Sequence, residues 1–311
     1  MYNEYIKWKD VFFMARGKKQ IKGQLSFNFC LDTTNQVVQS NDLISGKQAL
    51  DLNSAKLIRA AIMQIKPNDK ELKPYVLTIK EFANLIGVST DNVYRDVDKI
   101  TDDIVKHPVD IRIKTDKGKT AFIKIPWVQQ CEYVPDVGIA IELNSKLKKY
   151  ILQLSGNYTQ YALEQVMTMR SVYAIRIFEL LQESVKTRLL PKEGVNIEIP
   201  VQTLRECCDV ENKYQSFSNF RARVLDIATK EINRVTTYRV SYTYKKVGRK
   251  VTSIIFHMNM SYHDDVWPTD DVVVEAEATW LTLREALESR FAKQAYTSSI
   301  KYQKAILGDS V

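Results

Sequence analysis

The chain has 311 residues, of which 45% are hydrophobic and 26% charged, the balance of a folded protein with room for two domains. No apolar run approaches the roughly 18 residues of a membrane span, and the N-terminus lacks the pattern of a secretion signal, so we expect a cytoplasmic protein. The net charge of +8 favours a polyanionic partner, and the four scattered cysteines indicate neither disulfides nor a zinc site.

Residues 1–42 contain six Lys or Arg in their first 22 positions and show little periodicity, which predicts a flexible basic arm. Residues 43–155 are expected to form a first winged-helix domain. This stretch begins with three leucines at helical spacing: Leu43, Leu50 and Leu57. After a pair of short helices come alternating strands, and the turn Asp116-Lys117-Gly118 closes them into a hairpin that would supply the wing.

The short helix pair of this first domain lies within residues 79–98 and has the features of a helix-turn-helix. Ala83 allows the two helices to cross closely, and Gly87 can adopt the positive φ of a tight turn. Val93 fills the wedge between the helices, and Ser89 is placed to cap the second one. Because any two short helices joined by glycine can show this pattern, it supports a helix-turn-helix only if a second such pair occurs in the chain.

The same order of elements recurs over residues 156–262, which predicts a second winged-helix domain. The expected elements are a helix at Val172–Gln182 behind Ser171, a shorter helix from Val201, a long helix at Phe217–Ile232, and a hairpin with strands at Tyr238–Tyr244 and Val251–Phe256. The segment that starts at Ser54 also matches the one that starts at Ser171, with Arg59 opposite Arg176. The fold class is therefore α+β, with two tandem winged-helix domains related by internal duplication. Residues 263–311 would form an acidic and then helical tail.

Charge distinguishes the second helices of the two predicted helix pairs. Five aspartates outweigh Arg95 and Lys99 in the first, whereas the second is net basic. Because phosphate neutralisation supplies much of the affinity for DNA, we expect the second domain to read the bases. Projection at 100° per residue places the candidate base-reading residues on its polar side: Ser216, Asn219, Ala222 and Arg223. The candidate DNA-backbone contacts are Lys213, Arg221, Lys230, Lys245, Lys246, Arg249 and Lys250, with Arg95 and Lys99 in the first domain. A solvated helix face and a charged turn are the plain alternatives.

Three segments, in order along the chain, resemble the iteron-binding plasmid replication initiators. They are Met169-Arg-Ser-Val-Tyr-Ala-Ile-Arg-Ile-Phe-Glu-Leu-Leu, residues 214–233, and Gly248-Arg-Lys-Val-Thr-Ser-Ile-Ile-Phe. The resemblance implies a protein that binds direct repeats at a plasmid origin as a monomer, helps to open the duplex and recruits the host initiator and helicase. A dimer, in equilibrium with the monomer and paired through the first domain, would repress its own gene.

The resemblance also places base-contacting positions at Ser216, Ala222 and Arg223, with Arg221 beside them. Some relatives have arginine at the first two positions, so a different repeat should be read here. The Leu43, Leu50, Leu57 run looks like the zipper of some relatives, although so short a run is more often core. A peptide in the arm is similar to those that dock onto the replicative sliding clamp, with Gln24, Leu25, Phe27 and Phe29 as its key residues.

Enzymatic readings find little support in the sequence. A rolling-circle initiator needs paired histidines, but His107, His257 and His263 form no such pair, and no phosphate-binding glycine motif is present. We therefore expect no catalysis, no cofactor, no metal and no membrane partner. Two other classes remain open: a dedicated winged-helix transcriptional repressor, and a protein that acts only through interactions with other proteins.

Overall fold

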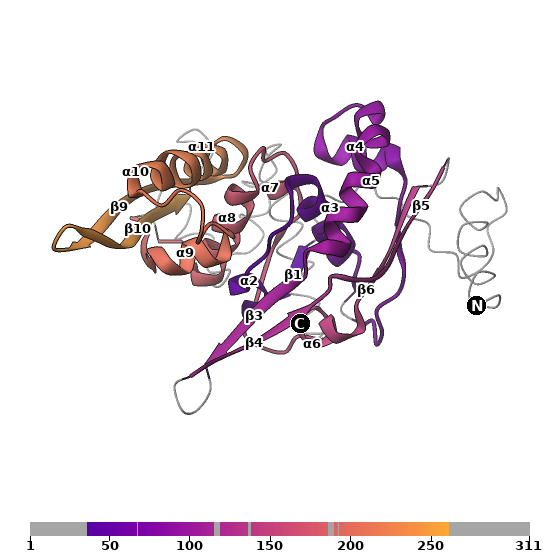
Figure 1. Cartoon of the computed structure of the whole chain (residues 1–311), viewed down its shortest axis with the longest axis horizontal. Helices are drawn as coiled ribbons and strands as arrows, with labels where there is room; N and C mark the ends of the chain where they lie inside the picture. Colours follow the sequence, from indigo (N-terminus) through magenta and orange to yellow (C-terminus); the bar gives the residue numbers. More distant parts are fainter. Residues whose placement is uncertain are drawn as a thin grey trace, which may run out of the picture. The chain divides into compact units, whose positions relative to one another are not determined.

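A computed structural model describes residues 36–260 except 67, 115–118, 136–137, 186–189 and 192 (Figure 1). The elements up to residue 167 are β1 (Gln36–Ser40), α2 (Asn41–Ser45), α3 (Leu52–Met63), β2 (Tyr75–Leu77), α4 (Ile79–Ile86), α5 (Thr90–Lys106), β3 (Val109–Lys114), β4 (Thr120–Ile125), β5 (Val128–Val134), β6 (Gly138–Leu143), the 3₁₀ turn η2 (Ser145–Leu147), α6 (Lys148–Ile151), β7 (Tyr158–Ala162) and α7 (Glu164–Met167). The later elements are α8 (Val172–Val185), β8 (Val195–Pro200), α9 (Val201–Cys207), α10 (Phe217–Phe220), the π turn η3 (Arg221–Leu225), α11 (Asp226–Val235), β9 (Tyr238–Val247) and β10 (Lys250–Met260). Within these described ranges, no helix has the length and apolar character needed to span a membrane.

Two modules with the same architecture account for most of these elements. In the first, α3, α4 and α5 accompany a sheet with the strand order β2-β6-β5. In the second, α8, α9 and the long helix from α10 to α11 accompany a sheet with the order β8-β10-β9. In each sheet the last strand in the chain, β6 or β10, lies in the middle, between the first strand (β2 or β8) and the second (β5 or β9). The predicted α+β class with two winged-helix domains is confirmed.

The helix-turn-helix of the first module has the predicted local structure. Gly87 ends α4 with a left-handed φ of 71°, and the Ser89 hydroxyl accepts a hydrogen bond from the backbone of Asn92 at the start of α5. Ala83 and Val93 are buried between the helices, at 0% and 2% exposure. Each of these features depends on neighbours in the sequence, which is why the pattern predicted it.

The wing of the first module is not the hairpin that the sequence indicated. Strands β3 and β4 pair with each other as a separate two-stranded sheet, which projects from the module in Figure 1. The third and second strands of the winged-helix sheet are instead β6 and β5, which follow it in the chain. The β3–β4 hairpin is therefore an insertion between α5 and the wing. Alternation of apolar residues reveals a strand but not its partner, so the sequence could not distinguish the two hairpins.

Strands from distant parts of the chain also pair. β1 pairs antiparallel with β7, with Val38 opposite Gln160. Residues 36–42, predicted to belong to the basic arm, thus form β1 and begin α2, and the β1–β7 pairing crosses the expected domain boundary at residue 155. The clamp-like peptide, the boundary at residue 262 and the tail lie outside the described residues and stay predictions.

The spaced leucines belong to the core rather than to one zipper helix. Leu43 lies in α2 and Leu57 in α3, whereas Leu50 lies in the non-helical connection between them. All three are buried, with exposed fractions of 0%, 3% and 0% in chain order. Their spacing of seven residues therefore reflects three separate contacts with the core.

Candidate nucleic-acid interface

The helix-turn-helix of the second module is formed by α9 and the helix that begins with α10. Arg205 on α9 organises the connection between them, because its guanidinium donates hydrogen bonds at 2.9 to 3.4 Å to the carbonyls of Val210, Lys213, Tyr214 and Gln215. The same guanidinium lies 4.4 Å from the centre of the Phe220 ring. Two non-glycine residues of this connection, Asp209 and Tyr214, have a positive φ of 52°. Arg205 thus holds a strained turn that fixes where the next helix begins.

Residues 217–235 form one continuous helix, called the recognition helix below, which contains a π turn at Arg221–Leu225. In this turn the backbone N–H of Asp226 donates to the carbonyl of Arg221, five residues before it. Projection at 100° per residue places Phe217, Phe220, Val224 and Ala228 on one apolar side; the last three are fully buried and Phe217 is half-buried. The exposed side carries Ser216, Ser218, Asn219, Arg221, Ala222, Arg223, Asp226, Ile227, Lys230 and Arg234.

All four predicted base-reading residues lie exposed at the N-terminal half of this helix. The Ser216 hydroxyl caps the helix by accepting from the backbone N–H of Asn219 at 3.3 Å. Arg223 makes no hydrogen bond or ion pair with any residue that the structure describes, so its five donors are available to a ligand. Ala222 beside it presents only a methyl group. The arrangement suits contacts to base edges, since the polar groups lie on a solvent-facing surface.

The predicted backbone contacts on the recognition helix, and Lys213 just before it, differ in whether they pair with carboxylates. Arg221 lies 3.9 Å from the Asp226 carboxylate, which also accepts from the Tyr242 hydroxyl. Lys213 lies 3.8 Å from Asp209. Lys230 is exposed and pairs with no residue within the described ranges. Such exposed pairs are weak, so they leave these cations free to exchange partners.

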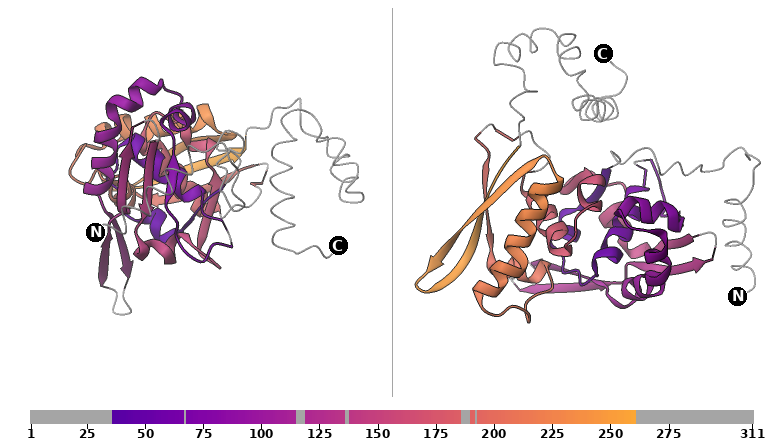
Figure 2. Two further views of the ribbon diagram at one scale, coloured as in Figure 1. Left: turned by 90° about the vertical axis from the view of Figure 1, so that its right-hand side faces the viewer. Right: turned by 90° about the horizontal axis from the view of Figure 1, so that it is seen from above.

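The β9–β10 hairpin forms a basic wing next to this helix and projects beyond the helices in Figure 2. The Tyr244 ring packs 5.4 Å from the ring of Phe217, and this contact joins the wing to the start of the recognition helix. Lys246 lies 5.2 Å above the Tyr244 ring, and Lys245 lies 3.5 Å from Glu198. Arg249 and Lys250 are exposed around the turn at Gly248. The predicted hairpin is confirmed, and its cations lie on the outside.

The first module presents a different surface. Arg95 makes hydrogen bonds of 3.0 and 3.2 Å to Asp96, and Lys99 lies 3.1 Å from Asp51. Arg95 and Lys99 thus lie in exposed ion pairs like those of Arg221 and Lys213, but on α5, a helix that is net acidic. The wing strands β5 and β6 contain no Lys or Arg. The exposed cations of the interface therefore belong mainly to the second module.

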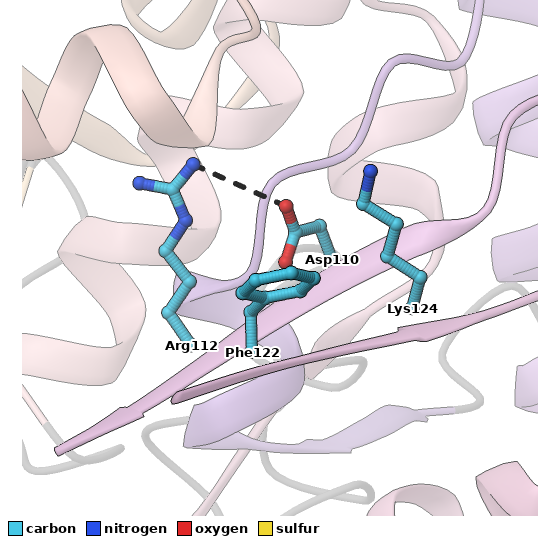
Figure 3. Close-up of a pocket in the computed structure, with 4 residues that line it drawn as sticks. All are labelled: Asp110, Arg112, Phe122 and Lys124. Atoms are coloured by element: carbon cyan, nitrogen blue, oxygen red, sulfur yellow. Dashed lines mark ion pairs between the residues drawn. The ribbon is translucent and has the colours of Figure 1, made fainter. Parts of the chain in front are cut away.

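The inserted β3–β4 hairpin is basic in sequence, and one of its cations, Arg112, pairs with acidic groups of the second module. Figure 3 shows Asp110, Arg112, Phe122 and Lys124 around a pocket on its surface. Arg112 lies 3.2 Å from Glu206 and 3.5 Å from Glu211, both from the α9 region of the second module. This arginine joins the two modules, which explains its charge without a nucleic acid.

A buried ion network lies at the junction of the modules. The Glu179 carboxylate on α8 accepts hydrogen bonds from Arg59 on α3 at 3.0 and 2.9 Å, from Arg176 at 2.5 Å, and from Tyr161 at 2.5 Å. Arg176 also donates to the carbonyl of Gly46 at 2.8 Å. Burial alone would raise the pKa of Glu179, but the two guanidinium groups lower it to about 2. The network links α3, β7 and α8 to the α2–α3 connection.

Sequence reasoning missed three of these features. Arg205 had no recognisable motif, and the π turn contradicts the uniform 100° projection used for the recognition helix. The match of Arg59 with Arg176 predicted an internal duplication, but no feature of the sequence near either arginine indicated that both would bind the Glu179 carboxylate. No group of three or more His, Cys, Asp or Glu side chains in the described ranges is placed to hold a metal ion.

The fold and its two surfaces define a protein of two winged-helix modules, the second with an exposed polar helix face and a basic wing. Family models agree: one described as "Initiator Replication protein, WH1" matches residues 36–182, and one described as "Initiator Rep protein, WH2" matches residues 200–258. The chain belongs to this family of replication initiator proteins.

Individual relatives are distant. A curated Escherichia coli protein described as a replication initiation protein is 23% identical over 234 residues, which are 74% of this chain and 71% of the relative. An uncharacterized 27.6 kDa protein of Escherichia coli is 22% identical over 236 residues, 72% of this chain and 95% of that protein. A crystal structure of the Pi initiator protein in complex with iteron DNA matches with a TM-score of 0.61 and 18% identity, covering 75% of this chain and 100% of that one. This structural likeness concerns the fold.

Proposed function

We propose that the protein initiates plasmid replication by binding direct repeats, or iterons, at the origin. The observation that carries this proposal is the exposed face of the recognition helix. There Arg223 is exposed and unpaired among the described residues, and the wing of the same module carries the exposed cations Arg249 and Lys250. Family membership and the relative that is described as bound to iteron DNA support the same function.

The two modules would divide the work. The second module reads base edges with Asn219, Ala222 and Arg223 and grips phosphates with its wing. The first module contacts backbone and pairs two copies, so that a dimer represses the gene of the initiator while monomers bind the repeats. The bound array then recruits the host initiator and helicase, and the arm peptide around Phe27 and Phe29 contacts the sliding clamp.

Origin opening would draw on binding free energy rather than on a chemical step. Several molecules on adjacent repeats bend the duplex and destabilise a neighbouring segment. Bending 20 to 30 base pairs costs on the order of 1–6 kcal/mol, which contacts spread over an array can offset. Nicking of supercoiled DNA or hydrolysis of ATP by the purified protein would contradict this mechanism.

Footprinting on the DNA that flanks the gene tests the proposal. Protection of several direct repeats in tandem is expected, and affinity should fall steeply as salt is added, because counterions are released on binding. Protection of a lone palindrome would instead favour a dedicated repressor. Binding that ignores salt, or no binding at all, would indicate a protein that works through other proteins.

A further inference from the structure

Ile227 is an aliphatic residue in the middle of the polar side of the recognition helix. The residue is 38% exposed, whereas Val224, three residues before it, and Ala228, next to it, are fully buried. The residues one helical turn before and after it are Arg223 and Lys230, and both are exposed. An amphipathic helix normally places a polar residue at such a position, so this isoleucine needs an explanation.

The π turn explains why Ile227 lies on this side. In a uniform α-helix, Ile227 would be rotated by about 80° from Asn219, toward the buried residues. A π turn contains one residue more than an α turn, so the residues after it are rotated back by up to about 100°, the rotation of one residue in an α-helix. The turn at Arg221–Leu225 therefore rotates Ile227 back toward the side of Asn219 and Arg223, and all three residues are exposed.

We propose that Ile227 contacts the 5-methyl group of a thymine in the major groove and so selects thymine at one position of the repeat. Each base pair presents a distinct pattern in the major groove, and thymine alone presents a methyl group, which apolar side chains recognise. Arg223 and Asn219 supply the hydrogen-bonding contacts on the same side, and Ile227 supplies the apolar one. The inference rests on the proposed function, since it requires the second module to read duplex DNA.

Selection from a library of random 30-base-pair duplexes tests the idea with the full-length protein. The wild type is expected to enrich sites with thymine at one position that Ile227→Ala no longer selects, while the other preferred positions stay the same. Ile227→Val keeps a branched aliphatic group and should retain the preference. Val105→Ala, at an exposed aliphatic position of α5, is the matched control and should select the wild-type sites.

Replacing that thymine by deoxyuridine then removes only the methyl group. Wild-type affinity should fall by about threefold to tenfold, as expected for the loss of one buried methyl contact. Ile227→Ala should bind both duplexes equally and with the affinity that the wild type shows for the deoxyuridine duplex. The melting temperature of each variant shows that it is folded.

Each outcome bears on a defined claim. If the wild type enriches sites but Ile227→Ala enriches the same ones, or if deoxyuridine weakens both proteins alike, the role of Ile227 is refuted and the proposed function stands. If the wild type enriches no sequence, the proposed function fails and this inference fails with it.

Discussion

Arg59 of α3 and Arg176 of α8, which match between two aligned segments of the sequence, both bind the carboxylate of Glu179. Arg59 reaches it at 2.9 and 3.0 Å and Arg176 at 2.5 Å. All three side chains are at most 1% exposed. Two matching arginines, one from each module, thus meet at one buried anion, and this contact holds the modules together.

Removal of the shared carboxylate should therefore be costly. Glu179→Gln leaves two buried guanidinium groups without their counter-charge, and we expect the free energy of unfolding to fall by about 3–5 kcal/mol. Urea titration followed by circular dichroism measures this loss. Asp102→Asn, which removes the partner of Lys106 in an exposed pair, is the control and should cost at most about 1 kcal/mol. Similar losses in the two variants would refute a structural role for the network.

The same network should make the protein acid-sensitive. The pKa of Glu179 is lowered from 4.5 to about 2, so the folded state prefers the charged carboxylate. Its stabilising contribution is complete above the unfolded pKa and is lost as the pH falls from about 5 to 2. The difference in unfolding free energy between wild type and Glu179→Gln should shrink over this range. A difference that stays constant with pH would contradict the assignment.

Glu183, one turn further along α8, should behave in the opposite way. Burial, aided by Asp42 and opposed by Arg176, raises its pKa from 4.5 to about 7. The folded state therefore prefers the protonated form, and stability declines as the pH rises from 4.5 to about 7. Glu183→Gln should raise the free energy of unfolding at pH 8 by about 1–2 kcal/mol, after allowance for solvent screening, and leave it unchanged at pH 4. An equal gain at both pH values would show that ionisation is not the cause.

The two kinds of predicted DNA contact can be separated by mutation. Arg223→Ala should weaken binding to the repeats by about 1–3 kcal/mol and binding to random duplex much less, because it removes a base contact. Lys250→Ala should weaken binding to both alike and reduce the slope of log affinity against log salt concentration by about 1, the release of one counterion. Fluorescence anisotropy over a range of salt concentrations measures both effects. Equal losses of specific and non-specific binding in the two variants would refute the division of roles.

The sequence by itself determined the local elements of both modules and the class of fold. The turn at Gly87, the cap at Ser89 and the buried side of the recognition helix at Phe220 and Val224 were all predictable. The reason is that each depends on the backbone preference of one residue or on side-chain periodicity over a few turns. The excess of cations in the second module was equally a property of the sequence.

The tertiary structure decided which distant segments meet. The wing of the first module is β5–β6 rather than β3–β4, the π turn moves Ile227 to the exposed side, and Glu179 unites Arg59 with Arg176. A pattern of alternating apolar residues indicates a strand but not which strand pairs with it. A helical projection at a constant 100° per residue cannot anticipate a π turn. Charges in the interior are stable only where long-range packing brings a counter-charge, and Arg59 and Glu179 are 120 residues apart. The candidate base-contacting residues of the recognition helix could thus be identified from the local sequence, whereas their position within the protein depends on contacts that only the folded chain makes.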